Sequence, residues 1–224
     1  MASPTTLPTM HAIGEIVRNA VVFKFRSGAN GADNMNDDLI PTVSRLFVTL
    51  KERGIDYVLV GGIAMLQYVE GRNTEDIDLI VAVSSLKKLP EIIIEDENEF
   101  FAQGKLSGLK IDFLLTRNRL FELVRRSYAT TRHFVEQDIP CATVEGLLLL
   151  KLYALPSLYR QGNFARVNLY EGDIAALMQA YRPDVAALFR ELANHLGGAD
   201  LQEVHGIASE IQERIDRFNR SAGK

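Results

Sequence analysis

The stretch that most restricts the fold is YVLVGGIAMLQYVEGRNTEDIDLIVAV, residues 57–83. Its segment DIDL places Asp76 and Asp78 one residue apart in a run that is apolar from Leu79 onward. On a β-strand, residues i and i+2 face the same side, so the two carboxylates point together and their neighbours face the core. Two like charges this close repel each other, more strongly where the site is partly buried. A hard divalent cation such as Mg²⁺ would turn that repulsion into binding, because it takes oxygen ligands from carboxylates and substrate phosphates.

The surroundings of this pair matter more than the pair itself. Gly61 and Gly62 end the preceding apolar run, where glycine lets the backbone approach a ligand and a following helix offers N–H groups to phosphate. Asp112, in KIDFLL, is a third carboxylate on a predicted neighbouring strand. A tight turn and surface aspartates at strand ends are the ordinary alternatives for each motif alone. Together the motifs predict a phosphate-binding loop beside a carboxylate site suited to two-metal phosphoryl transfer.

The order of the predicted elements indicates an α+β fold. Residues 1–37 form a partly irregular N-terminal segment, in which 14–25 is either helix or strand and 26–38 is a loop. Residues 38–116 read as helix, strand, helix, strand and further strands, which predicts a small mixed β-sheet with flanking helices. Residues 117–224 predict a C-terminal helical bundle. The expected helices there cover 117–127, 143–155, 170–181, 183–196 and 200–218.

Composition excludes several classes of protein. The 224 residues carry 25 Lys and Arg against 29 Asp and Glu, a net charge of −4, so the whole chain is not a basic nucleic-acid binder. One cysteine, Cys141, cannot form an internal disulfide framework or a cysteine-rich zinc site. No apolar run approaches the ~20 residues of a transmembrane helix, and the N-terminus lacks the order of a signal peptide. We therefore expect a cytoplasmic protein without a membrane partner.

The chain resembles a known superfamily. An apolar strand, Gly-Gly, thirteen residues and Asp-x-Asp resemble the signature of the nucleotidyltransferases that include DNA polymerase β. More narrowly, VGGIAM…GRNTEDIDLIV is similar to the bacterial AbiEii-type toxin nucleotidyltransferases and the related MenT toxins. That branch has Lys-x-x-Ala on a helix and then an aspartate at the start of another helix; here Lys151, Ala154 and Asp173 match these positions. The resemblance covers residues 38–181 and implies the nucleotidyltransferase fold.

The resemblance implies roles for individual residues. The implied metal ligands, for Mg²⁺ or Mn²⁺, are Asp76, Asp78 and Asp112, which are also catalytic. The implied nucleotide contacts are Gly61, Gly62, Arg72, Thr74 and Lys151. Lys151 would contact phosphates, and Asp173 would complete the site by orienting Lys151 or by placing the acceptor. Many members have Gly-Ser where this chain has Gly-Gly, so only backbone N–H donors remain at that position.

Structural explanations remain open for several of these residues. Arg72 could pair with Glu70 or Glu75 at the surface, Lys151 could extend to solvent from an apolar face, and Asp173 could be a helix N-cap. Residues 117–170 contain eight Lys and Arg against four Asp and Glu. This excess would form either a basic surface suited to RNA or an ordinary solvated helix face.

The sequence thus predicts a Mg²⁺-dependent enzyme that moves a nucleoside monophosphate from an NTP to an acceptor and releases pyrophosphate. The resemblance makes tRNA a candidate acceptor, with the protein as the toxin of a toxin–antitoxin pair and an antitoxin as its partner. Two alternatives stay open. One keeps the chemistry with a small molecule or a protein as acceptor, and the other is a catalytically silent protein that binds nucleotide or a partner, such as an antitoxin.

Overall fold

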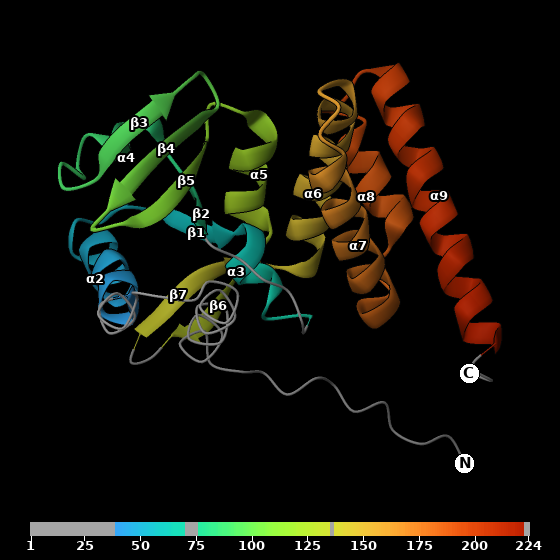
Figure 1. Ribbon diagram of the computed structural model, residues 1–224, viewed down its shortest axis with the longest axis horizontal. Helices are drawn as coiled ribbons and strands as arrows, with labels where there is room; N and C mark the ends of the chain where they lie inside the picture. The colour runs from blue at the N-terminus through green and yellow to red at the C-terminus, as the bar shows by residue number, and fades with distance from the viewer. Residues whose placement is uncertain (1–38, 70–75, 135–136, 222–224) are drawn as a thin grey trace, which may run out of the picture. The chain divides into compact units, whose positions relative to one another are not determined.

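The computed structural model describes residues 39–69, 76–134 and 137–221 (Figure 1). The chain divides into two compact units, residues 1–142 and 143–224. The expectations for residues 1–38 lie outside the described residues. None of the described helices is long and apolar enough to cross a membrane.

The first unit is built on one seven-stranded mixed sheet with the order β3-β4-β5-β2-β1-β7-β6. The pairs β2–β5 and β1–β7 are parallel, and the other four neighbouring pairs are antiparallel. The strands are β1 (Tyr57–Val60), β2 (Asp76–Val81), β3 (Ile93–Glu97), β4 (Phe101–Leu106), β5 (Leu109–Leu115), β6 (Ala129–Phe134) and β7 (Gln137–Ala142). The predicted mixed sheet is confirmed, and so is the predicted strand that carries Asp112.

Helices of the first unit pack on both faces of this sheet. These are α2 (Leu39–Glu52), α3 (Gly61–Met65), α4 (Val83–Leu86) and α5 (Arg119–Ser127). Phe47 of α2 stacks on Tyr57, with ring centroids 5.8 Å apart. Phe121 of α5 meets Phe101 edge to face at 5.4 Å. The strand registers put Tyr57 and Phe101 on opposite faces, and Figure 1 shows the two helices on either side of the strands.

Local sequence accounts for the element boundaries. The predicted helix before β1 is confirmed as α2, and Gly54 follows it with φ +58°, a left-handed conformation that favours glycine. Ser107 and Gly108 join β4 to β5 with φ of +48° and +84°, the pattern of a two-residue type I′ hairpin. Helix α3 begins directly at Gly61 and is shorter than the two turns expected for residues 63–71.

The outer edge of the sheet at β3 is protected against further strand pairing. All five residues of β3 are exposed, and three of them are acidic. The register with β4 shifts between Ile94 and Asp96, which marks a bulge. Charges and bulges on an edge strand oppose pairing with another sheet, so the exposed apolar side chain of Ile93 is compatible with a free edge.

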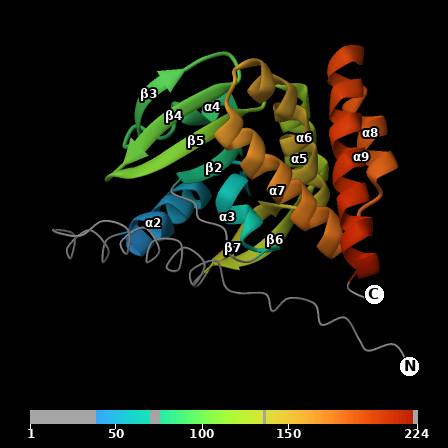
Figure 2. The ribbon, with the colours of Figure 1, turned by 45° about the vertical axis from the view of Figure 1, so that its right-hand side comes forward.

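The second unit is helical, with α6 (Val144–Arg160), α7 (Phe164–Tyr181), α8 (Val185–Leu192) and α9 (Gly198–Ser221), as Figures 1 and 2 show. The helical region starts later than expected, because residues 129–134 and 137–142 form strands β6 and β7 of the sheet. Thr143 caps α6 as predicted, accepting a hydrogen bond from the Gly146 N–H at 3.3 Å. Asn163 caps α7, which therefore begins six residues before the expected start at residue 170.

A partly buried hydrogen bond of this helical unit has a testable pH dependence. The Tyr159 hydroxyl donates to Glu171. This bond, with partial burial and the charges of Glu171, Glu203 and Glu210, raises the pKa of Tyr159 to about 12. The folded pKa lies above the ordinary value near 10, so the stabilisation is complete below about pH 10 and is lost as the pH rises through about 12.

We therefore expect Tyr159→Phe to lower the free energy of unfolding by about 1–2 kcal/mol at pH 8. The difference from the wild-type chain should shrink between pH 10 and 12, as the wild-type hydroxyl loses its proton. Urea denaturation followed by circular dichroism at pH 8, 10 and 11.5 measures both quantities. A difference that stays constant over this range would contradict the assigned hydrogen bond.

Candidate active site

The three predicted carboxylates lie on one face of two neighbouring parallel strands. Asp78 of β2 is the register partner of Asp112 of β5, and Asp76 is the partner of Lys110. Partners in register share a sheet face, so all four side chains point the same way. All four residues are partly buried, while Ile80, further along the same face of β2, is fully buried. The site is therefore placed where the covered sheet face opens toward solvent.

Gly61 lies directly against Asp78. Its φ is +62°, and a Cβ built on it would be 1.8 Å from Asp78 Oδ2 and 2.6 Å from Asp78 Cβ. The Gly62 N–H donates a hydrogen bond to Asp78 Oδ2 at 3.2 Å. The glycine pair thus shapes the backbone around a carboxylate, a role that the sequence reasoning missed because it assigned both glycines to the nucleotide.

Lys110 is a second feature that the sequence reasoning missed. Its Nζ lies 3.5 Å from Asp76 Oδ2, with side-chain exposures of 43% and 25%. The available signal was its spacing, since Lys110 is two residues before Asp112 and shares its face on an alternating strand. On β2 and β5, this face therefore presents three carboxylates and one ammonium group.

The residues present fit a hard divalent cation. Carboxylate oxygens on one face, with a backbone that leaves room for Asp78 only because residue 61 has no Cβ, are the donor type that Mg²⁺ and Mn²⁺ prefer. Within the described ranges no group of three or more His, Cys, Asp or Glu is arranged as a ready metal centre. Mg²⁺ commonly takes only one or two protein carboxylates, so Asp76 and Asp78 satisfy that requirement when substrate phosphates complete the shell.

The second unit brings Lys151 and Asp173 together. Lys151 Nζ lies 2.7 Å from Asp173 Oδ2, and the two side chains are 5% and 7% exposed. Nζ also lies 4.3 Å from the centre of the Tyr170 ring, a cation–π contact. Lys151 therefore does not extend to solvent, and Asp173 is in the middle of α7 rather than at its N-cap. Roles of these two residues toward a nucleotide remain predictions.

Most cations of residues 117–170 already have partners within their own unit. Arg125 pairs with Glu122 and Asp56, Arg126 with Glu122, and Arg160 with Asp200. Arg132 stacks on Tyr68 at 5.2 Å. These contacts favour a structural role for the positive charges. They argue against a continuous basic surface.

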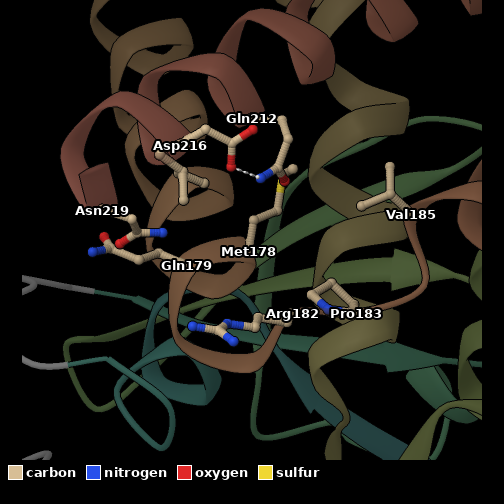
Figure 3. A pocket seen from close by; sticks show the side chains of 9 residues that line it. Met178, Gln179, Arg182, Pro183, Val185, Gln212, Asp216 and Asn219 are labelled. Atoms are coloured by element: carbon tan, nitrogen blue, oxygen red, sulfur yellow. Dashed lines mark hydrogen bonds between the residues drawn. The ribbon is translucent and has the colours of Figure 1, made fainter. Parts of the chain in front are cut away.

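The remaining candidates are a buried cysteine, two residues shortly before β2 in the sequence, and a hollow in the helical unit. Burial raises the pKa of Cys141 to about 12, so its thiol is neutral near pH 7 and is not a nucleophile. Arg72 and Thr74 lie outside the described residues. A hollow of about 390 Å³ opens between the ends of α7 and α9, beside Arg182 and Asp216 (Figure 3). None of the predicted site residues that the structure describes lines this hollow.

Comparison with known proteins identifies the fold. No family model and no curated protein sequence matches the chain. It is similar to the crystal structure of an antigenic nucleotidyltransferase-like protein from Paracoccidioides brasiliensis, with 23% identity over 83% of this chain and 92% of that chain and a TM-score of 0.54. It is also similar to the antibiotic-resistance factor ANT(2'')-Ia, with 14% identity, 72% and 100% coverage and a TM-score of 0.45. The first likeness shows that the chain has a nucleotidyltransferase-like fold.

Proposed function

We propose that the protein is a metal-dependent nucleotidyltransferase, which moves a nucleoside monophosphate from an NTP to an acceptor. One observation carries the proposal: Asp78 and Asp112 lie side by side on parallel strands, and the Gly61 backbone is packed against Asp78. Two adjacent, partly buried carboxylates repel each other. This repulsion destabilises the fold unless a cation binds there. The nucleotidyltransferase-like fold supports the same function.

The chemistry assigned to these residues is an in-line substitution at phosphorus. The acceptor oxygen attacks the α-phosphorus of the NTP, a new P–O bond forms, and the bond to the β-phosphate oxygen breaks to release pyrophosphate. The acceptor proton passes to Asp112 or to water. A bound Mg²⁺ or Mn²⁺, held by Asp76 and Asp78 with Asp112 beside them, would neutralise phosphate charge. The protein's contribution is positioning and electrostatics.

The remaining site residues are proposed to bind the nucleotide. Lys151 would supply a point charge to the phosphates, and Asp173, 2.7 Å away, would hold its ammonium group in place. Arg72 and Thr74 would contact the triphosphate, as would the backbone at Gly62. The support for these assignments is the resemblance, together with the observed pairing of Lys151 and Asp173.

We propose tRNA as the first acceptor to test, because the motifs resemble those of the AbiEii-type and MenT toxin nucleotidyltransferases. On this proposal the protein acts as a toxin, and its cognate antitoxin is a partner. Small molecules with hydroxyl groups and protein side chains are the other acceptors for the same chemistry.

The test is transfer of label from each of four α-³²P-labelled NTPs, with Mg²⁺ or Mn²⁺. The acceptors are total RNA, an aminoglycoside and the protein itself. We expect one nucleotide to label one acceptor, with release of pyrophosphate. Replacing Asp78 with Asn should reduce the rate at least about 100-fold, because the substitution removes a metal-binding charge while keeping the side-chain size.

The matched control is Asp96→Asn, the same substitution at an exposed position of β3. It should leave transfer unchanged, and circular dichroism should show both variants folded. Transfer by Asp78→Asn at the wild-type rate would contradict the proposed site. Absence of metal-dependent NTP binding in calorimetry, for all four nucleotides, would favour the catalytically silent alternative.

A further inference from the structure

The carboxylate face of the sheet carries its own cation. Asp76 and Asp78 on β2 lie in register with Lys110 and Asp112 on β5, so the four side chains mark the corners of a rectangle. Three corners are acidic and one is basic, and the basic corner contacts the acidic one beside it at 3.5 Å. We call this set the charge quartet.

We propose that Lys110 is an exchangeable counterion of Asp76, which occupies part of the metal site and is displaced when a divalent cation binds. This inference rests on the proposed function, because it assumes that Asp76 and Asp78 bind the cation. It adds a residue to that site and explains how the Asp76 carboxylate is stabilised without a metal.

The contact has the properties that exchange requires. An ion pair at 3.5 Å with one side chain 43% exposed is weak and screened by solvent, so little is lost when it opens. The long, flexible lysine side chain can move its ammonium group into water without moving the strand. By contrast, Lys151 is 5% exposed and lies 2.7 Å from its partner, which makes that pair fixed.

The competition has a predictable sign. A positive charge next to a metal ligand both occupies that ligand and repels the incoming cation, so removing the charge must strengthen metal binding. We expect Lys110→Met to bind Mn²⁺ about threefold to tenfold more tightly than the wild-type chain, without nucleotide. The gain should shrink when NaCl is raised from 50 to 500 mM, because salt screens the repulsion. Lys110→Arg, which keeps the charge, should bind like the wild-type chain.

Mn²⁺ titration followed by electron paramagnetic resonance measures this affinity directly, with no need for catalysis. The matched control is Lys105→Met. Lys105 is the register partner of Lys110 on β4, one strand further from Asp76, and pairs with Glu95 at 2.7 Å. The Lys105→Met substitution removes the same charge from the same sheet face. A general electrostatic effect on Mn²⁺ binding would therefore appear equally in both variants.

The outcomes separate this inference from the proposed function. Tighter binding in Lys110→Met, but not in Lys105→Met or Lys110→Arg, supports the exchange. If Asp78→Asn abolishes Mn²⁺ binding but Lys110→Met leaves it unchanged or weakens it, this inference alone is wrong. If Mn²⁺ binding is absent or ignores Asp78→Asn, the ion does not bind at the charge quartet, and both proposals fail.

Discussion

Replacing Gly61 with alanine is expected to abolish nucleotidyl transfer while leaving the protein folded. The added Cβ would lie 1.8 Å from Asp78 Oδ2, 2.2 Å from its Cγ and 2.6 Å from its Cβ. Contacts this short cannot persist, and because the Asp78 Cβ is included, a rotation of the carboxylate alone does not relieve them. The strand or the turn must therefore shift, and we expect Asp78 to move relative to Asp112 and to the Gly62 N–H that binds it.

The expected magnitudes follow from two separate effects. Alanine at a φ of +62° destabilises the fold by about 1–2 kcal/mol, and the displaced contacts add a cost of similar size. Loss of a positioned carboxylate from the proposed metal site should reduce transfer at least about 100-fold and weaken Mn²⁺ binding. Urea denaturation, Mn²⁺ titration and the labelled-nucleotide assay measure these three quantities on the same preparation.

Gly54→Ala is the matched control for Gly61→Ala. Gly54 has nearly the same backbone conformation, φ +58°, but nothing lies within 4 Å of an added Cβ. It should show the backbone strain alone, with transfer and Mn²⁺ binding unchanged. Wild-type Mn²⁺ binding by Gly61→Ala would mean that the contact with Asp78 is not required for the site.

The carboxylates could be predicted from sequence because their signal is local. Alternation along DIDL and KIDFLL assigns Asp76, Asp78 and Asp112 to polar faces of their strands, and the structure confirms those strands. The pairing of β2 with β5 is not local, since 27 residues, including the β3–β4 hairpin, lie between Val81 at the end of β2 and Leu109 at the start of β5. The contact between Lys110 and Asp76 depends on that register, which no short window contains.

The contact of Gly61 with Asp78 could not be predicted from sequence for a related reason. A Gly-Gly at the end of a strand has a general explanation, close approach of a ligand, that makes no reference to other parts of the chain. In the structure its immediate neighbour is the carboxylate of Asp78, 17 residues later. Only the pairing of Val60 with Asp78 brings them together.

The late start of the helical bundle has a different cause. Residues 129–142 read ATTRHFVEQDIPCA, where polar residues and Pro140 obscure any strand pattern. Residues 129–134 and 137–142 become strands because β7 joins the sheet beside β1 and β6 pairs with β7. In α7, exposed Phe164 and Leu169 disturb the helical periodicity at its beginning, so the sequence favoured a start near residue 170.

The second large effect is expected at Lys151, where methionine should lower the free energy of unfolding by about 3–5 kcal/mol. The substitution keeps the length of the side chain but leaves the Asp173 carboxylate buried without the ammonium group 2.7 Å away. It also removes the charge that lies 4.3 Å from the Tyr170 ring. A buried charge that loses its partner is among the few causes of destabilisation this large.

Arg160→Met on the same helix is the matched control for Lys151→Met. Arg160 also pairs at 2.7 Å, with Asp200, but its side chain is 60% exposed. Loss of an exposed ion pair lowers the free energy of unfolding by less than about 1 kcal/mol. Because both pairs have the same distance of 2.7 Å, the difference between the two variants reports the effect of burial. Equal effects of the two substitutions in chemical denaturation would show that burial does not decide the strength of the Lys151–Asp173 pair.

A double substitution separates a structural pair from a catalytic one. Lys151→Met combined with Asp173→Leu leaves no buried charge, so we expect it to recover most of the stability that Lys151→Met loses. If Lys151 also binds phosphate, the stable double variant should still fail to transfer nucleotide. Recovery of stability together with wild-type transfer would assign the pair to the fold alone and remove Lys151 and Asp173 from the proposed active site. Recovery of stability without transfer is the result expected if Lys151, held in place by Asp173, binds the nucleotide phosphates.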